Sequence, residues 1–119
     1  MTVVAIDHVQ LAIPPGSDAA ARHFYIELMG FVEIPKPEAL RVRGGMWFQA
    51  GPVQIHLGVE DGMRASAKAH PALVVDDLDA LRARLVGAGC EWRDDHEIPS
   101  VRRAHIRDPF GNRIELIQQ

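Results

Sequence analysis

The chain has a single cysteine and no long hydrophobic run. Cys90 is the only cysteine among 119 residues, so no disulfide can form within the chain, as in proteins of a reducing cytoplasm. No apolar run approaches the roughly 20 residues that a membrane-spanning helix requires. The N-terminal segment lacks the basic start and small-residue cleavage pattern of a signal peptide. The sequence therefore predicts a cytoplasmic protein with no membrane association.

An excess of positive charge is also missing. Lysine and arginine total 13, aspartate and glutamate total 16, and the net charge is -3. Such a balance predicts no nucleic-acid partner, because a nucleic-acid interface needs a basic patch. The length indicates one domain, residues 1–119, that can bury a core but often gains stability from a partner chain.

The order of predicted elements is the same in the two halves of the chain. Branched apolar runs, capping residues and turn residues place these elements in the first half: a strand at 3–13, a helix from Ser17 or Asp18 to Gly30, and strands at 31–35, 41–49 and 52–59. The same signals predict for the second half a strand at 70–75, a helix from Asp76 or Asp77 to Gly89, and strands at about 91–93, 101–107 and 113–118. Each half therefore reads as one βαβββ module, about 1–60 and about 68–119. In the turn before the last strand, we expect Asp108 to shape the backbone.

Four potential metal ligands lie at matched positions of the two modules. His8 and His56 are 48 residues apart in the first module, and His70 and Glu115 are 45 apart in the second. Alternation along the strands places His8, His56 and Glu115 on polar faces, whereas the strand after His70 is apolar on both sides. Three imidazoles and a carboxylate suit a divalent Zn, Ni, Mn, Co or Fe ion. The alternative is that these are ordinary polar residues of a sheet face.

Further polar side chains share the faces of these candidate ligands. Trp47 and Gln49 face away from the apolar residues of their strand, as do Arg103 and His105 in theirs. We expect these four residues to line a substrate pocket, with a solvated sheet edge as the alternative.

Four segments resemble those of the vicinal oxygen chelate superfamily of glyoxalases, bleomycin-resistance proteins and extradiol dioxygenases. They are DHVQLAIP around His8, QIHLGV around His56, HPALVVDDLDAL from His70, and DPFGNRIEL with Glu115, which is the most specific. The resemblance covers essentially the whole chain and implies an α+β fold. In that fold, two βαβββ modules form a cupped eight-stranded mixed sheet with helices on the outer face. It also implies a homodimer and metal ligands at His8, His56, His70 and Glu115.

The resemblance implies a divalent-metal-dependent enzyme for a small molecule with vicinal oxygens. Such an enzyme would be a lyase, isomerase or dioxygenase, with Glu115 as the catalytic residue that handles protons. His56 stands where glyoxalase I carries a carboxylate, which departs from that family. His8, His70 and Glu115 reproduce the ligand trio of extradiol dioxygenases, which are usually longer. The alternative is a bleomycin-resistance-type protein that sequesters a small molecule or antibiotic without turnover.

Overall fold

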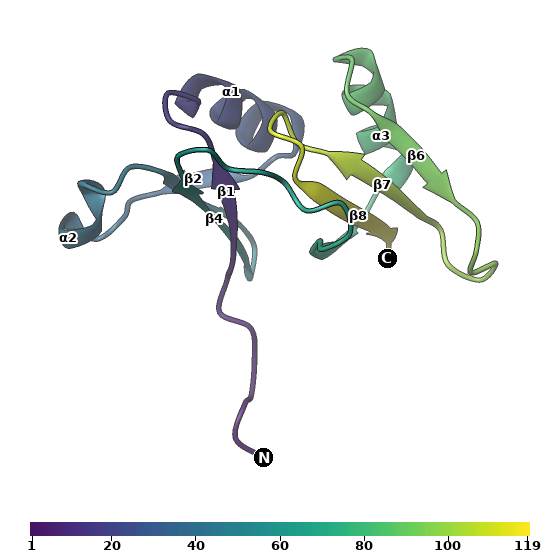
Figure 1. The fold of residues 1–119 in the computed structure, drawn as a ribbon. Helices are drawn as coiled ribbons and strands as arrows, with labels where there is room; N and C mark the ends of the chain where they lie inside the picture. Colours follow the sequence, from purple (N-terminus) through teal and green to yellow (C-terminus); the bar gives the residue numbers. More distant parts are fainter. The chain divides into compact units, whose positions relative to one another are not determined.

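The computed structural model describes residues 1–119, which form two compact units, residues 1–63 and 64–119. Each unit contains a strand, a helix and three further strands in chain order (Figure 1). The predicted α+β class and the two βαβββ modules are confirmed, and the eight strands form two four-stranded mixed sheets. That the two units make one domain stays a prediction. None of the helices combines the length and the apolar character that crossing a membrane requires.

The first unit contains a four-stranded sheet with one parallel pair. Its elements are β1 (Val9–Ile13), α1 (Asp18–Arg22), the π-helical η1 (His23–Leu28), β2 (Val32–Ile34), α2 (Glu38–Arg41), β3 (Met46–Ala50) and β4 (Val53–Val59). The strand order is β1-β4-β3-β2, in which only the β1–β4 pair is parallel. Strand alternation buries Met46, Phe48, Ile55 and Leu57 together in the core. Tyr25 of η1 stacks on Phe48 with ring centroids 5.4 Å apart, which fixes the helix to this face.

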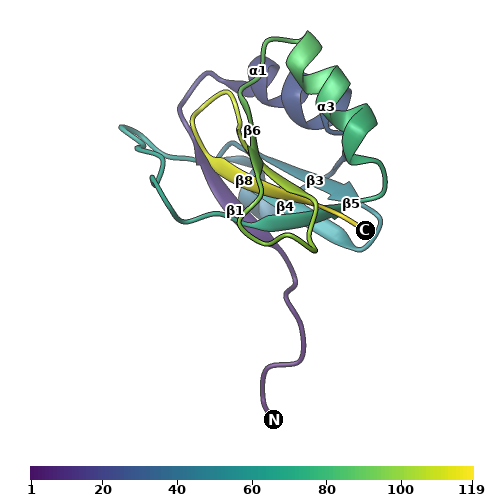
Figure 2. The same ribbon diagram turned by 90° about the vertical axis from the view of Figure 1, so that its right-hand side faces the viewer.

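The second unit repeats this topology. Its elements are β5 (Ala72–Val75), α3 (Leu78–Gly87), β6 (Trp92–Asp95), β7 (Arg103–Arg107) and β8 (Arg113–Gln118). The strand order is β5-β8-β7-β6, with β5 and β8 parallel. The predicted apolar stripe of α3 (Leu78, Leu81 and Leu85) is buried, as are Ala104, Ile106, Ile114 and Leu116 of the sheet. Figure 2 shows α3 on one face of this sheet, which leaves the opposite face to the polar residues.

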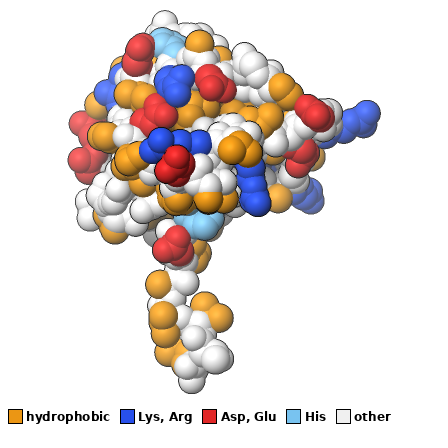
Figure 3. All heavy atoms as spheres, turned by 90° about the vertical axis from the view of Figure 1, so that its left-hand side faces the viewer, with side chains coloured by type: hydrophobic (Ala, Val, Ile, Leu, Met, Phe, Trp, Pro, Cys, Tyr) orange, Lys and Arg blue, Asp and Glu red, His pale blue; other side chains and the backbone are white.

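Several predicted strands begin later than the sequence indicates, and β1 and β5 are the two that bear on the candidate ligands. β1 begins at Val9 rather than at residue 3. Its parallel partner β4 is preceded by the hairpin turn around Gly51, so the first residues of the chain have no neighbouring strand with which to pair. Residues 1–8 are therefore outside any helix or strand, and their apolar side chains are exposed (Figure 3). Likewise β5 begins at Ala72, so His70 lies in the loop before it.

The predicted strand 41–49 is wrong over its first residues. The segment Glu38–Arg41 forms the short helix α2, because glutamate, alanine, leucine and arginine all favour helix and Pro37 suits its start. Gly44 and Gly45 then adopt positive φ angles, which end the helical turn before β3. The strand itself begins at Met46.

Candidate functional site

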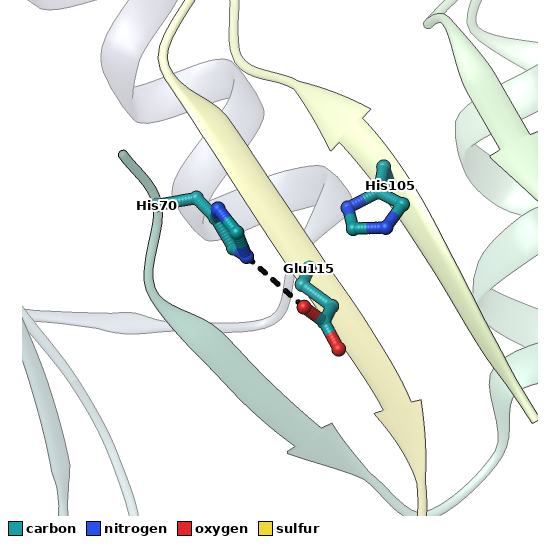
Figure 4. A group of neighbouring side chains, drawn as sticks. All are labelled: His70, His105 and Glu115. Atoms are coloured by element: carbon teal, nitrogen blue, oxygen red, sulfur yellow. Dashed lines mark hydrogen bonds and ion pairs between the residues drawn. The ribbon is translucent and has the colours of Figure 1, made fainter. Parts of the chain in front are cut away.

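The second unit brings together two imidazoles and a carboxylate on the polar face of its sheet. One potential ligand atom from each of His70, His105 and Glu115 lies within 4.8 Å of the others (Figure 4). Glu115 on β8 is directly opposite His105 on β7, and His70 comes from the loop before β5, on the other side of β8. The predicted pair of His70 and Glu115 is thus close in space, whereas its role as a metal-ligand pair stays a prediction.

The contacts of His70 suit a metal ligand. Its Nδ1 atom donates a hydrogen bond to the Lys68 carbonyl oxygen at 2.6 Å, so Nδ1 carries a proton. Its Nε2 atom lies 3.0 Å from Oε1 of Glu115. In the metal-free protein Nε2 donates a hydrogen bond to this carboxylate, and release of that proton would leave Nε2 with a lone pair for a metal ion beside the same oxygen. Histidines that bind metals usually donate their other ring N–H to a carbonyl or carboxylate in this manner, so the donor chemistry fits a divalent cation.

Glu115 is held in one orientation by an arginine. Nη1 of Arg103 donates to Oε2 of Glu115 at 3.2 Å, and Nη2 of Arg103 donates to Oδ2 of Asp95 at 3.0 Å. Burial favours protonation of Glu115, but the hydrogen bonds of His70 and Arg103 and the charges of Arg103 and His105 together outweigh burial. The pKa of Glu115 therefore lies below its ordinary value. The carboxylate is ionised at neutral pH, as a metal ligand must be.

Both ring nitrogens of His105 already have partners. Nε2 donates to Oδ2 of Asp95 at 2.8 Å, and Nδ1 lies 3.4 Å from Nη2 of Arg113, from which it can accept. A metal ion would have to displace Asp95 or Arg113 from His105, whereas the Nε2 partner of His70 is itself a predicted ligand. The role of His105 beside a substrate stays a prediction. The sequence predicted Arg103 and His105 as pocket residues. In the structure both contact Asp95, Arg103 also contacts Glu115, and His105 is directly opposite Glu115.

Asp95 is the residue of this cluster that sequence reasoning missed. It accepts hydrogen bonds from the backbone N–H of Glu97 and from His105, and these contacts and Arg103 hold its pKa below the ordinary value. The predicted strand ended at residue 93, two residues too early. With β6 extended to Asp95, strand pairing places Asp95 directly opposite Arg103, which was the available signal.

The first unit stacks three rings on the polar face of its sheet. The ring centroids of His8 and His56 are 3.9 Å apart, and those of Trp47 and His56 are 4.0 Å apart, with the planes nearly parallel in both pairs. Trp47 on β3 is directly opposite His56 on β4, so strand pairing sets this contact. A groove of about 600 Å³ is lined by these rings and by Gln10, Lys36 and Arg43, among others.

His56 is buried between its neighbours and neutral. Its Nε2 atom donates to Oε1 of Gln54 at 2.9 Å. Burial and then the nearby His8 lower the pKa of His56, Lys36 acts in the same direction, and Asp7 opposes them. A neutral imidazole is the form that can bind a metal, so the surroundings of His56 are compatible with its predicted role.

Gln49 does not join these residues. It lies on the same face of β3 as Trp47, but its side-chain amide donates to the Gly51 carbonyl oxygen at 2.9 Å, and it does not line the groove. The structure thus groups the other candidates by unit: His8, Trp47 and His56 in the first, and His70, Arg103, His105 and Glu115 in the second.

Comparisons with known proteins cover nearly the whole chain. Residues 5–116 match the Glyoxalase/Bleomycin resistance protein/Dioxygenase superfamily. The comparison with curated proteins found no match. Among solved structures, a protein described as belonging to the glyoxalase family, from Bacillus anthracis, is 46% identical. It has a TM-score of 0.95, and the alignment covers 100% of this chain and 98% of that one.

Two further structures are less similar in sequence. TnmS3, an antibiotic binding protein from Streptomyces sp. CB03234, is 28% identical with a TM-score of 0.71, and the alignment covers 98% of each chain. The fosfomycin resistance protein FosX from Listeria monocytogenes shares the fold, with 15% identity, a TM-score of 0.80, and 99% and 95% of the two chains covered. The superfamily match and the 46% identity to the Bacillus anthracis protein show that this chain belongs to the glyoxalase/bleomycin resistance protein/dioxygenase superfamily.

Proposed function

We propose that this protein is a divalent-metal-dependent enzyme that acts on a small molecule with vicinal oxygens, as a lyase, isomerase or dioxygenase. The observation that carries the proposal is the pairing of His70 and Glu115. The Nδ1 atom of His70 is anchored on a carbonyl, and its Nε2 atom faces an ionised carboxylate oxygen at 3.0 Å. The family resemblance also implies His8 and His56 of the first unit as ligands. Zn, Ni, Mn, Co and Fe all accept such donors.

The predicted site residues of the two units have separate tasks in the proposed reaction. A bound divalent ion would supply positive charge that stabilises negative charge on a substrate oxygen. Arg103 fixes the Glu115 carboxylate through Oε2, which leaves Oε1 directed at His70. Glu115 is the catalytic residue of the proposal and accepts a substrate proton in its ionised form. His105 and Arg103 orient polar groups of the substrate, and Trp47 offers an aromatic surface in the groove of the first unit.

Metal uptake tests the proposal. Purified protein is stripped with a chelator and titrated calorimetrically with Zn, Ni, Mn, Co and Fe(II) in turn. We expect saturable binding of at least one ion, and we expect His70→Gln to weaken it at least tenfold, as loss of a neutral nitrogen ligand does. His23→Gln is the matched control, because His23 also pairs with a glutamate, Glu27, but on the exposed surface of the first unit. No uptake of any ion by the unmodified protein would contradict the proposal.

A sequestering protein is the second candidate. It is favoured by the antibiotic binding relative TnmS3, which aligns over nearly the whole chain, and by a groove of about 600 Å³ with stacked rings on its wall. Aromatic surfaces of this kind bind planar organic molecules. A protein that takes up no metal but binds such molecules, and loses this binding on Trp47→Ala, would support sequestration. Homodimerisation and a cytoplasmic location stay predictions.

A further inference from the structure

The second unit carries a small pocket surrounded by three arginines. The pocket has a volume of about 100 Å³ and is lined by Glu91, Arg93, His105, Ile106, Arg107 and Arg113. It is built from residues of β6, β7 and β8 and the residue before β6. Neither the family match nor the proposed metal pair accounts for this concentration of positive charge.

Strand pairing brings the three guanidinium groups to one face of the sheet. Arg93 on β6 is directly opposite His105 on β7, and Arg107 on β7 is directly opposite Arg113 on β8. Residues that face each other on antiparallel strands project to the same side, as do residues two apart on one strand. Two arginines directly opposite each other repel, and a bound anion would relieve this repulsion.

None of the three arginines forms an ion pair with a carboxylate. Arg107 donates to the carbonyl oxygens of Ser66, Ala67 and Gly111. Arg113 donates to the Ala67 carbonyl and approaches His105, and its Nε atom is buried without a partner. Arg93 has no hydrogen-bond partner, and Glu91 forms no ion pair with any of them.

Other arginines of the chain contrast with this group. Arg22, Arg102 and Arg103 each pair with a carboxylate at 2.6 to 3.3 Å. The second unit therefore pairs Arg102 and Arg103 with carboxylates and leaves three arginines without such a partner around one cavity. We propose that this pocket binds an oxyanion, namely the carboxylate or phosphate group of a small molecule. The planar guanidinium fork matches both groups.

His105 connects this pocket with the metal pair. It lines the pocket, and it is directly opposite Glu115 across β7 and β8. The His105–Glu115 pair follows the Arg107–Arg113 pair on the same face of the sheet, so a molecule whose charged group lies among the arginines can extend along this face toward Glu115. This step rests on the proposed function: the substrate is an organic anion that carries its vicinal oxygens near its charged group.

Titration with simple anions tests the pocket without a known substrate. Inorganic phosphate and, separately, acetate are titrated into chelator-treated protein at constant ionic strength, with binding followed by calorimetry and by amide shifts in NMR spectra. We expect one saturable site, with amide shifts in β6, β7 and β8. Saturation by phosphate alone would identify a phosphate group, and saturation by acetate would identify a carboxylate.

Arg93→Gln is the decisive variant, because Arg93 is exposed and has no protein partner to lose. Removal of its charged hydrogen bonds should weaken anion binding about tenfold. Arg102→Gln is the matched control: it removes the same charge from the same unit, but its side chain is 59% exposed and pairs with Asp79 outside the pocket. We expect its affinity for the anion to be unchanged.

Two results would overturn the inference. One is the absence of saturable binding by either anion, and the other is equal weakening by Arg93→Gln and Arg102→Gln, which would indicate a general charge effect. Metal titration of the same samples separates this proposal from the proposed function. Metal uptake without anion binding contradicts only the oxyanion site, whereas anion binding without metal uptake contradicts only the metal-dependent enzyme.

Discussion

His56 shows how neighbours decide what a single residue can do. Its ring lies between those of His8 and Trp47, its side chain is nearly inaccessible to solvent, and Gln54 accepts its one N–H hydrogen bond. A second proton on this ring would be buried beside another imidazole and near Lys36, which is why its pKa lies below the ordinary value of 6.5. The neutral ring can stack, donate one hydrogen bond and offer one lone pair.

This pKa predicts a pH dependence of stability in the metal-free protein. The unfolded chain binds a proton at His56 more readily than the folded protein, so the unfolding free energy rises with pH in this range. The contribution of His56 is fully present above pH 6.5 and is lost as the pH falls from there toward the lower pKa of the folded state. We expect His56→Gln to flatten the slope of unfolding free energy against pH below 6.5, as measured by urea titration. His23→Gln, with a side chain 58% exposed, should keep the slope, and an equal slope in the original protein and His56→Gln would contradict the assignment.

The residues of the site were predictable where they follow strand alternation. Period-two alternation predicted that these residues share the polar faces, and the observed register places His56 opposite Trp47 and Glu115 opposite His105. Asp95 lies opposite Arg103 by the same pairing, but it was missed because polar residues near a strand end do not mark that end. The three-arginine pocket was also beyond reach, because the net charge of -3 averages over arginines that pair with acids and arginines that do not.

The start of α3 shows a single capping interaction that the sequence left open between two aspartates. Asp77 is the N-cap residue, and its Oδ1 accepts a hydrogen bond from the backbone N–H of Ala80 at 3.0 Å. The helix then buries Leu78, Leu81 and Leu85 in the core of its unit. The cap therefore stabilises the helix that packs on the sheet, on the face opposite the candidate metal site.

Removal of this cap should destabilise the protein by a measurable amount. We expect Asp77→Ala to lower the unfolding free energy by about 1 kcal/mol, because an N–H of the first helical turn loses its acceptor. Asp76→Ala is the neighbouring control and should have little effect, since its side chain is exposed and does not cap the helix. Urea titration of the three proteins measures the difference, and equal losses in both variants would assign the stabilisation to charge near the helix rather than to the cap.

Turn chemistry was predicted more reliably than strand ends. Asp108 was expected to shape its turn, and it accepts hydrogen bonds from the backbone N–H groups of Phe110 and Asn112 and from the Asn112 side chain. The start of β1 depends instead on where its parallel partner β4 begins. The paired residues Val9 and Ile55 are 46 positions apart along the chain, so the local sequence around β1 does not contain this information. The helix α2 was missed because Glu38–Arg41 makes only about one turn, too short for a periodic pattern.

At the scale of the whole molecule, the repeated order of elements was the strongest prediction. Both units have the same strand order, with the first and last strands parallel, although their sequences share little. Hydrophobic periodicity and turn residues are enough to predict the order of elements along the chain, whereas the family resemblance implied their arrangement in sheets. The function is less determined, since the superfamily that this chain belongs to includes both resistance and antibiotic binding proteins on the same fold.

The proposed function depends above all on the binding of a divalent ion by Glu115 together with His70. Calorimetric titration of metal into Glu115→Gln tests it most directly, with Glu27→Gln as the matched control, since Glu27 also accepts a hydrogen bond from a histidine but lies on the surface. Near-ultraviolet circular dichroism of both variants checks that the fold is intact. We predict that Glu115→Gln loses metal affinity by at least tenfold while Glu27→Gln keeps it. Full metal affinity in a folded Glu115→Gln protein would contradict the account.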